Sequence, residues 1–250
     1  MSKASATLAS AMLVASAANY LLNVFLARWL LPDEFGDANL MVTLMLATSA
    51  VAAALQLLTA RRISTADAET AKATRRISLR RAWMIGGGIG FLAISGAPAL
   101  RDVTSSASAL PFVILGIGIP FYLTQAVERG VLQGELRFKR LALTFMVEAA
   151  TRLGATLGAV TLGFGVVGAT TGLSVSFVAS WLAARPSRAA RAGTSATVTR
   201  AAEDGAARRA ATATSILLVA QIIINNGDVV LAKVLFDAEA AGIYAVVALV

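Results

Sequence analysis

The chain has 250 residues, of which 57% are hydrophobic and 14% are charged, and its mean hydropathy is +0.74. A soluble domain carries about 25% charged residues, so this composition excludes an ordinary soluble protein and predicts a membrane protein. Cys and His are both absent, which excludes disulfides and removes the commonest metal ligand and proton shuttle. The net charge of +8 lies in segments between apolar runs, so it indicates membrane topology and we expect no nucleic-acid partner.

Six apolar runs are each long enough to cross a membrane as a helix. They cover residues 8–31, 37–60, 82–100, 110–127, 141–162 and 166–184. An Arg-rich polar segment at 185–209 predicts a flexible linker. A seventh run covers 210–236, and an eighth begins near Gly242 and continues to the last residue. The sequence therefore predicts an all-α, polytopic transmembrane bundle. We expect a six-helix N-terminal bundle at 1–184, a cytoplasmic linker at 185–209, and the first one and a half helices of a second, truncated bundle at 210–250.

The connections between these runs predict the orientation of the bundle. Eighteen of the 22 Lys and Arg residues lie in the N-terminal tail, a basic loop at 61–81, a basic amphipathic connector at 128–140, and the linker. One, Arg101, lies in a connection on the other side, together with the acidic turns that contain Asp33, Glu34 and Asp37. Basic residues stay on the cytoplasmic side, so we expect a multi-pass membrane protein with a cytoplasmic N-terminus.

A signal peptide is an alternative interpretation of the first run. Lys3 would form its basic start, and Ala15-Ser16-Ala17 resembles a cleavage site. The apolar run continues for many residues beyond that site, which favours a first membrane span over a cleaved peptide.

An internal repeat connects the two ends of the chain. Shifted by 205 positions, Asn23 corresponds to Asp228, Arg28 to Lys233, and Glu34 to Glu239. Each copy has a polar residue, an apolar run with one base, and then an acidic turn. A repeat of this length predicts two related structural halves, an arrangement common in transporters.

Charged and polar residues within the spans are the candidate functional residues, because a charge at a helix centre costs about 2.5–3.5 kcal/mol. Glu148 and Arg152 are one turn apart in the fifth span. They form either a structural pair that neutralises itself or a cationic site for an anionic substrate, with a carboxylate that exchanges protons.

Three further groups are candidates for the substrate or ion pathway: Asn19 and Asn23 on one face of the first span, Gln221, Asn225 and Asp228 on one face of the seventh, and Arg28 and Lys233 near outer helix ends. For the asparagines the alternative is hydrogen bonding between helices. For Arg28 and Lys233 it is contact with lipid headgroups.

Glycine pairs at four-residue spacing predict close helix packing, at Gly86 and Gly90, at Gly154 and Gly158, and at Gly168 and Gly172. Pro120 predicts a kink in the fourth span. The sequence contains no nucleophile motif, phosphate-binding loop or metal-ligand spacing, so we expect no catalytic residues, metal or cofactor.

Four features of the chain resemble bacterial polysaccharide-biosynthesis flippases of the multidrug/oligosaccharidyl-lipid/polysaccharide (MOP) exporter superfamily. They are ERGVLQG at 128–134 with Arg137-Phe138, the Glu148 and Arg152 pair, LGFGVVG at 162–168, and the opening LLPDEFG at 30–36. Residues 225–244 resemble the seventh and eighth spans of that family. The resemblance implies two six-helix halves around a central cavity. It also implies transfer of a polyprenyl-diphosphate-linked oligosaccharide between the leaflets of the bacterial inner membrane.

Arg152, Arg28 and Lys233 would supply the positive charge for such a diphosphate. Two alternatives remain open. One is a cation-coupled exporter of organic cations from the same superfamily, in which Asp228 or Glu148 would bind H⁺ or Na⁺. The other is a membrane-embedded glycan polymerase or ligase, which the short external connections disfavour.

Overall fold

The computed structural model describes residues 3–185 and 227–247, and the described residues are helical apart from short connections. The helices are α1 (Lys3–Trp29), α2 (Pro32–Ser64), α3 (Ala68–Ser95), α4 (Ala97–Val103), α5 (Leu110–Gly134), α6 (Phe138–Thr161), α7 (Gly165–Ala184), a helical segment at 227–235, and α9 (Ala238–Val247). The predicted all-α transmembrane bundle is therefore confirmed. The parts of the seventh run and of the linker that lie at 186–226 are outside the described residues.

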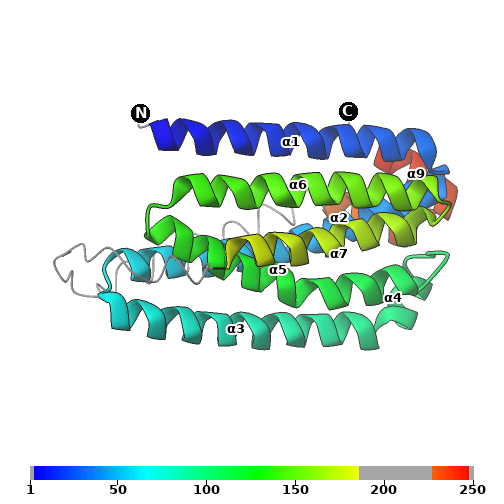
Figure 1. Ribbon diagram of the computed structural model, residues 1–250. Coiled ribbons are helices and arrows are strands. Elements are labelled where there is room, and N and C mark those ends of the chain that lie inside the picture. The colour runs from blue at the N-terminus through cyan, green and yellow to red at the C-terminus, as the bar shows by residue number, and fades with distance from the viewer. Residues whose placement is uncertain (1–2, 186–226, 248–250) are drawn as a thin grey trace.

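The long helices run side by side along one axis, with α1 and α6 on one flank and α3 on the opposite flank (Figure 1). The N-terminus, the α2–α3 turn and the α5–α6 connection lie at one end of the bundle, which we call the proximal end. The α1–α2 turn, α4, the α6–α7 turn and α9 lie at the other, the distal end. All three predicted basic segments that the structure describes thus fall at the proximal end.

Five helices of the described part of the chain are long and apolar enough to cross a membrane: α1, α2, α3, α5 and α7. The fifth predicted span, α6, has 24 residues but carries Glu148 and Arg152 in its interior. Large apolar side chains such as Leu13, Leu21, Phe91 and Leu92 are more than half exposed on the outer surface. Such an apolar surface is suited to lipid and not to water.

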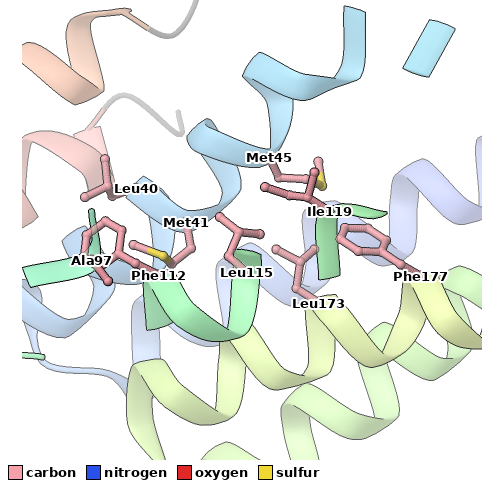
Figure 2. Close-up of a cluster of buried hydrophobic side chains, with 9 residues drawn as sticks. All are labelled: Leu40, Met41, Met45, Ala97, Phe112, Leu115, Ile119, Leu173 and Phe177. Carbon is pink, nitrogen blue, oxygen red and sulfur yellow. The ribbon is translucent and has the colours of Figure 1, made fainter. Parts of the chain in front are cut away.

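The main core lies where α2, α4, α5 and α7 meet. Figure 2 shows its nine buried side chains: Leu40, Met41, Met45, Ala97, Phe112, Leu115, Ile119, Leu173 and Phe177. Close packing of this kind fixes the positions of α2, α5 and α7 relative to one another. By contrast, α1 packs mainly against α6 and barely against α2. The weak α1–α2 contact leaves space between these two helices.

Several predicted boundaries were wrong at the helix ends. The predicted basic loop at 61–81 is only a three-residue turn, because α2 continues to Ser64 and Asp67 caps α3 by accepting a hydrogen bond from the Thr70 amide at 2.8 Å. The predicted third span breaks at Gly96, where α3 ends and α4 begins. The predicted connector at 128–140 is mostly helical, because α5 continues to Gly134 and α6 begins at Phe138.

A tight turn joins α6 to α7, with Gly163 and Gly165 both at positive φ. Close packing is also confirmed for Gly86 and Gly90, where an added Cβ would collide with the backbone of Pro120 and Gly116 in α5. It is confirmed in the same way for Gly168 and Gly172 against α6. Gly154 and Gly158 show no such packing within residues 3–185 and 227–247, because a Cβ on either would meet none of their atoms within 4 Å.

Candidate functional site

The most concentrated polar cluster in the described part of the bundle is a charged triad of Arg129, Glu148 and Arg152. One oxygen of Glu148 accepts from Arg152 Nη2 at 2.5 Å, and the other accepts from Arg129 Nη2 at 2.6 Å. Glu148 and Arg152 lie one turn apart in α6, and Arg129 reaches them from α5. The three side chains are 7–13% exposed. Two guanidinium groups share one carboxylate, so the triad carries one net positive charge.

Uncharged groups complete the coordination of the triad. Arg129 Nε donates to Thr144 Oγ1 at 3.0 Å, its Nη2 donates to Ser180 Oγ at 2.9 Å, and its guanidinium lies 3.9 Å from the centre of the Phe145 ring. Gln125 Nε2 donates to Glu148 at 3.3 Å. Arg129 is therefore enclosed by acceptors and an aromatic face, an arrangement that offsets the cost of burying a charge.

Arg152 differs from Arg129 because it borders a cavity. Its Nη1 donates to Asn19 Oδ1 at 3.2 Å and its Nε to Ser176 Oγ at 3.4 Å. The cavity has a volume of about 240 Å³ and lies among α1, α2, α6 and α7, in the region where α1 and α2 barely touch. Its polar lining consists of Asn19, Asn23, Arg152, Thr156 and Thr170, and its remaining lining is apolar. Arg152 is the charged residue among the described lining side chains, so the cavity wall is cationic.

A second ionic cluster lies at the distal end and joins segments far apart in the chain. Lys233 Nζ donates to Asp37 Oδ1 at 2.6 Å, and both residues are buried. Ser106 Oγ donates to the same oxygen at 2.8 Å, and the Ala107 amide donates to Oδ2 at 3.3 Å. Gly36 makes room for the lysine, since a Cβ there would lie 3.1 Å from Lys233 Cε. We call Asp37 and Lys233 the distal pair.

Two predictions about these residues were wrong. Asp37 was expected in an external acidic turn, but it is the third buried residue of α2 and is 6% exposed. For Lys233, the alternative of contact with lipid headgroups is wrong, since the residue is 2% exposed and Asp37 provides a charged partner inside the bundle. The expectation of a self-neutralising Glu148 and Arg152 pair was incomplete, because Arg129 shares the same carboxylate.

The remaining predicted residues are not gathered at one place. Asn19, Asn23 and Arg152 line the cavity together. Arg28 is exposed on α1 and does not line the cavity. Asp228 accepts from the Tyr244 hydroxyl at 2.8 Å, within the segment formed by 227–235 and α9. Gln221 and Asn225 lie outside the described residues.

Comparisons with known proteins agree on the fold. No protein-family model and no curated protein sequence matches the chain. An inward-facing multidrug resistance MATE family transporter of the MOP superfamily is similar with a TM-score of 0.70 and 17% identity, covering 98% of this chain and 60% of that one. The outward-facing conformation of such a transporter is similar with a TM-score of 0.62 and 23% identity, covering 73% of this chain and 44% of that one. The chain has the fold of MATE transporters. A MOP superfamily transporter from Pyrococcus furiosus is also similar, with a TM-score of 0.60 and 22% identity over 73% of this chain and 43% of that one.

The chain spans less than two thirds of the length of each of these MATE-fold structures. Both copies of the predicted repeat fold alike, as a helix, a short turn and a second helix. The first copy is α1 with the start of α2, and the second is 227–235 with α9. α9 packs against α2, where Gly36 and Gly242 allow close backbone approach. The two copies thus share a helix–turn–helix form, and the division of the chain into two related halves stays a prediction.

Sequence reasoning missed three buried charged residues of this MATE-like bundle. Arg129 was assigned to a connector because basic residues follow it, although its neighbours in 122–132, apart from Gln125 and Glu128, are apolar or small. Glu128 was assigned in the same way, yet its side chain is 2% exposed and accepts from Arg75 Nε of α3 at 2.9 Å. Asp37 was missed because it follows two other acidic residues in a turn. Adjacent opposite charges such as Glu128 and Arg129 at the end of an apolar run are the signal that could have identified the first two.

Proposed function

We propose that the chain is part of a membrane transporter that moves a lipid-linked oligosaccharide across the bacterial inner membrane, with Arg152 binding the diphosphate of the lipid carrier. The observation that carries this proposal is the cationic wall of the cavity. A guanidinium is a good partner for phosphate, because its planar fork donates two parallel hydrogen bonds. Phosphate in a low-dielectric bundle requires such a partner.

Among the described residues, the lining of the cavity is mostly apolar and contains one cationic side chain, Arg152. A lipid-linked diphosphate has matching chemistry, since a charged head is joined to an apolar chain. The similar transporter from Pyrococcus furiosus was described as having a binding pocket of reverse polarity that suggests a different function. Pockets of more than one polarity thus occur on this fold. We also propose that the proximal end faces the cytoplasm, as the distribution of basic residues predicts.

The test is complementation of a strain that lacks its own flippase, with surface glycan as the readout. Arg152→Ala, expressed from the natural gene, should abolish glycan export while the protein still folds, because Glu148 keeps its bond to Arg129. Arg101→Ala is the matched control, since Arg101 is an exposed arginine paired with its neighbour Asp102 near the distal end. It should export normally. Normal export by Arg152→Ala at an unchanged protein level would contradict the proposal.

The second candidate function is cation-coupled export of organic cations. Two of the similar structures are described as multidrug resistance transporters, and Asp228 is a carboxylate within the second copy of the repeat. Such an exporter needs a carboxylate that alternates between H⁺ or Na⁺ and its substrate. Organic-cation resistance that disappears in Asp228→Asn, together with retained resistance in Arg152→Ala, would favour this candidate over the flippase.

A further inference from the structure

Glu148 occupies the position of an anion within the charged triad. Each of its two oxygens is bound by a different arginine, at 2.6 Å by Arg129 and at 2.5 Å by Arg152. A carboxylate bound by two guanidiniums satisfies the same donors that would bind a phosphate oxygen. The substrate of the proposed transporter would therefore have to compete with Glu148 for Arg152.

The two arginines are held to different degrees. Arg129 has five polar or aromatic contacts, with Thr144, Ser180, Phe145 and Glu148, and it does not line the cavity. Arg152 lines the cavity, and its contacts other than Glu148 are longer: two hydrogen bonds of 3.2 and 3.4 Å, and the Phe177 ring, whose centre lies 5.6 Å from the guanidinium carbon. Arg152 is thus the arginine that can turn toward a ligand, while Arg129 stays bound to Glu148.

Resting on the proposed function, we infer that Glu148 is an internal substitute for the anionic group of the substrate and that Arg129 sets how strongly it competes. In the empty site Arg152 binds Glu148, so no buried guanidinium is left unpaired. When a phosphate enters, Arg152 exchanges one anionic partner for the other. Arg129 continues to neutralise Glu148, which prevents the carboxylate from becoming an unpaired buried charge.

The exchange also explains how a tightly bound anion can leave. An isolated buried arginine would hold a diphosphate strongly, and transport requires release on the other side of the membrane. Glu148 recovers Arg152 as the phosphate leaves, so release does not expose an unpaired charge. Arg129 acts through Glu148 without contacting the ligand in the cavity, and it is therefore a positioning residue.

A series of variants that changes the charge of the triad tests this inference, with inorganic diphosphate as the ligand and isothermal titration calorimetry of the purified protein in nanodiscs as the measurement. Glu148→Gln removes the competitor and should tighten binding by roughly tenfold. Arg129→Gln leaves Glu148 with Arg152 as its sole arginine in the triad and should weaken binding by roughly tenfold. The double variant keeps the net charge of the wild type and frees Arg152, so it should bind more tightly than the wild type.

Glu148→Gln alone leaves two arginines without a carboxylate and is at risk of not folding. In that case the double variant still tests whether Glu148 competes with the ligand for Arg152. If the double variant binds diphosphate no more tightly than the wild type, the proposed exchange of Arg152 between Glu148 and phosphate is wrong. An unchanged dissociation constant in Arg129→Gln, with lower thermal stability only, would show that Arg129 is merely structural and overturns its positioning role. Arg152→Met separates the two proposals. If it binds diphosphate as the wild type does, the proposed function fails. If it loses binding while the double variant does not tighten, only the exchange fails.

Discussion

The charged triad and the distal pair are both buried ionic clusters, but they differ in net charge and in whether they border a cavity. The distal pair contains one cation and one anion, and Asp37 accepts from Lys233, Ser106 and the Ala107 amide. The triad has one surplus guanidinium, and Arg152 lies at a cavity. Their side chains are 2–8% exposed in the distal pair and 7–13% in the triad.

This difference indicates different roles. In the distal pair the two charges neutralise each other and Asp37 accepts three hydrogen bonds, so we expect it to hold α2 against the 227–235 segment and not to bind a ligand. An unbalanced cluster at a cavity retains the capacity to bind an anion. Burial of charge alone therefore does not single out the triad, whereas its surplus charge beside a cavity supports the binding role that we propose for it.

The largest expected effect follows from breaking the distal pair. Lys233→Met removes the lysine and leaves the buried Asp37 carboxylate without a cation, at a cost of about 3–5 kcal/mol in the free energy of unfolding. The measurement is reversible unfolding in mixed micelles. Lys233→Met combined with Asp37→Asn should recover most of the loss, because no unpaired charge remains. A double variant as unstable as the single one would contradict this account.

The corresponding change in the triad should cost less stability. Arg152→Met leaves Glu148 bound to Arg129 and Gln125, so we expect a loss of about 1–2 kcal/mol in the same unfolding measurement. The smaller loss reflects the second arginine, which keeps the carboxylate paired. The control is Arg129→Gln/Arg152→Met, which removes both partners and should be much less stable than either single variant. Equal stability of the double and single variants would show that Arg129 does not compensate.

The architecture was largely predictable from the sequence, because apolar runs of span length can hardly form anything other than helices in lipid. All six runs before the linker are helices, and most errors concern their ends. Those errors have a common cause. Basic and acidic residues were assumed to mark the end of a span, whereas Arg75, Glu128 and Arg129 find partners across helices and extend the helical segments.

The candidate site was predictable only in part. The i, i+4 spacing identifies Glu148 and Arg152 because both lie on one helix. It cannot identify Arg129, which reaches Glu148 from another helix, or the pairing of Asp37 with Lys233 across 196 residues. Likewise, Asn19 and Arg152 are 133 residues apart, and their meeting at the cavity depends on how α1 packs against α6. Helix packing, which local spacing does not encode, determines these contacts.

The last comparison, which includes the smallest expected effect, takes one neutral hydrogen-bonding group from each cluster. Ser106→Ala removes a hydroxyl that donates to the buried Asp37 carboxylate. It should cost about 1–2 kcal/mol in the free energy of unfolding, since hydrogen bonds to charged groups are stronger than those between neutral groups. Asn19→Ala removes an acceptor from Arg152 at the cavity and should cost only about 0.5 kcal/mol, because the guanidinium keeps Glu148 and the cavity can supply another acceptor. Both values come from the same unfolding measurement, and Ser95→Ala serves as the background control, since the exposed Ser95 hydroxyl only bonds within its own helix. Equal losses of stability for Ser106→Ala and Asn19→Ala would show that a lost hydrogen bond is no easier to replace in the triad than in the distal pair. The contrast between a structural cluster and a binding cluster would then be wrong.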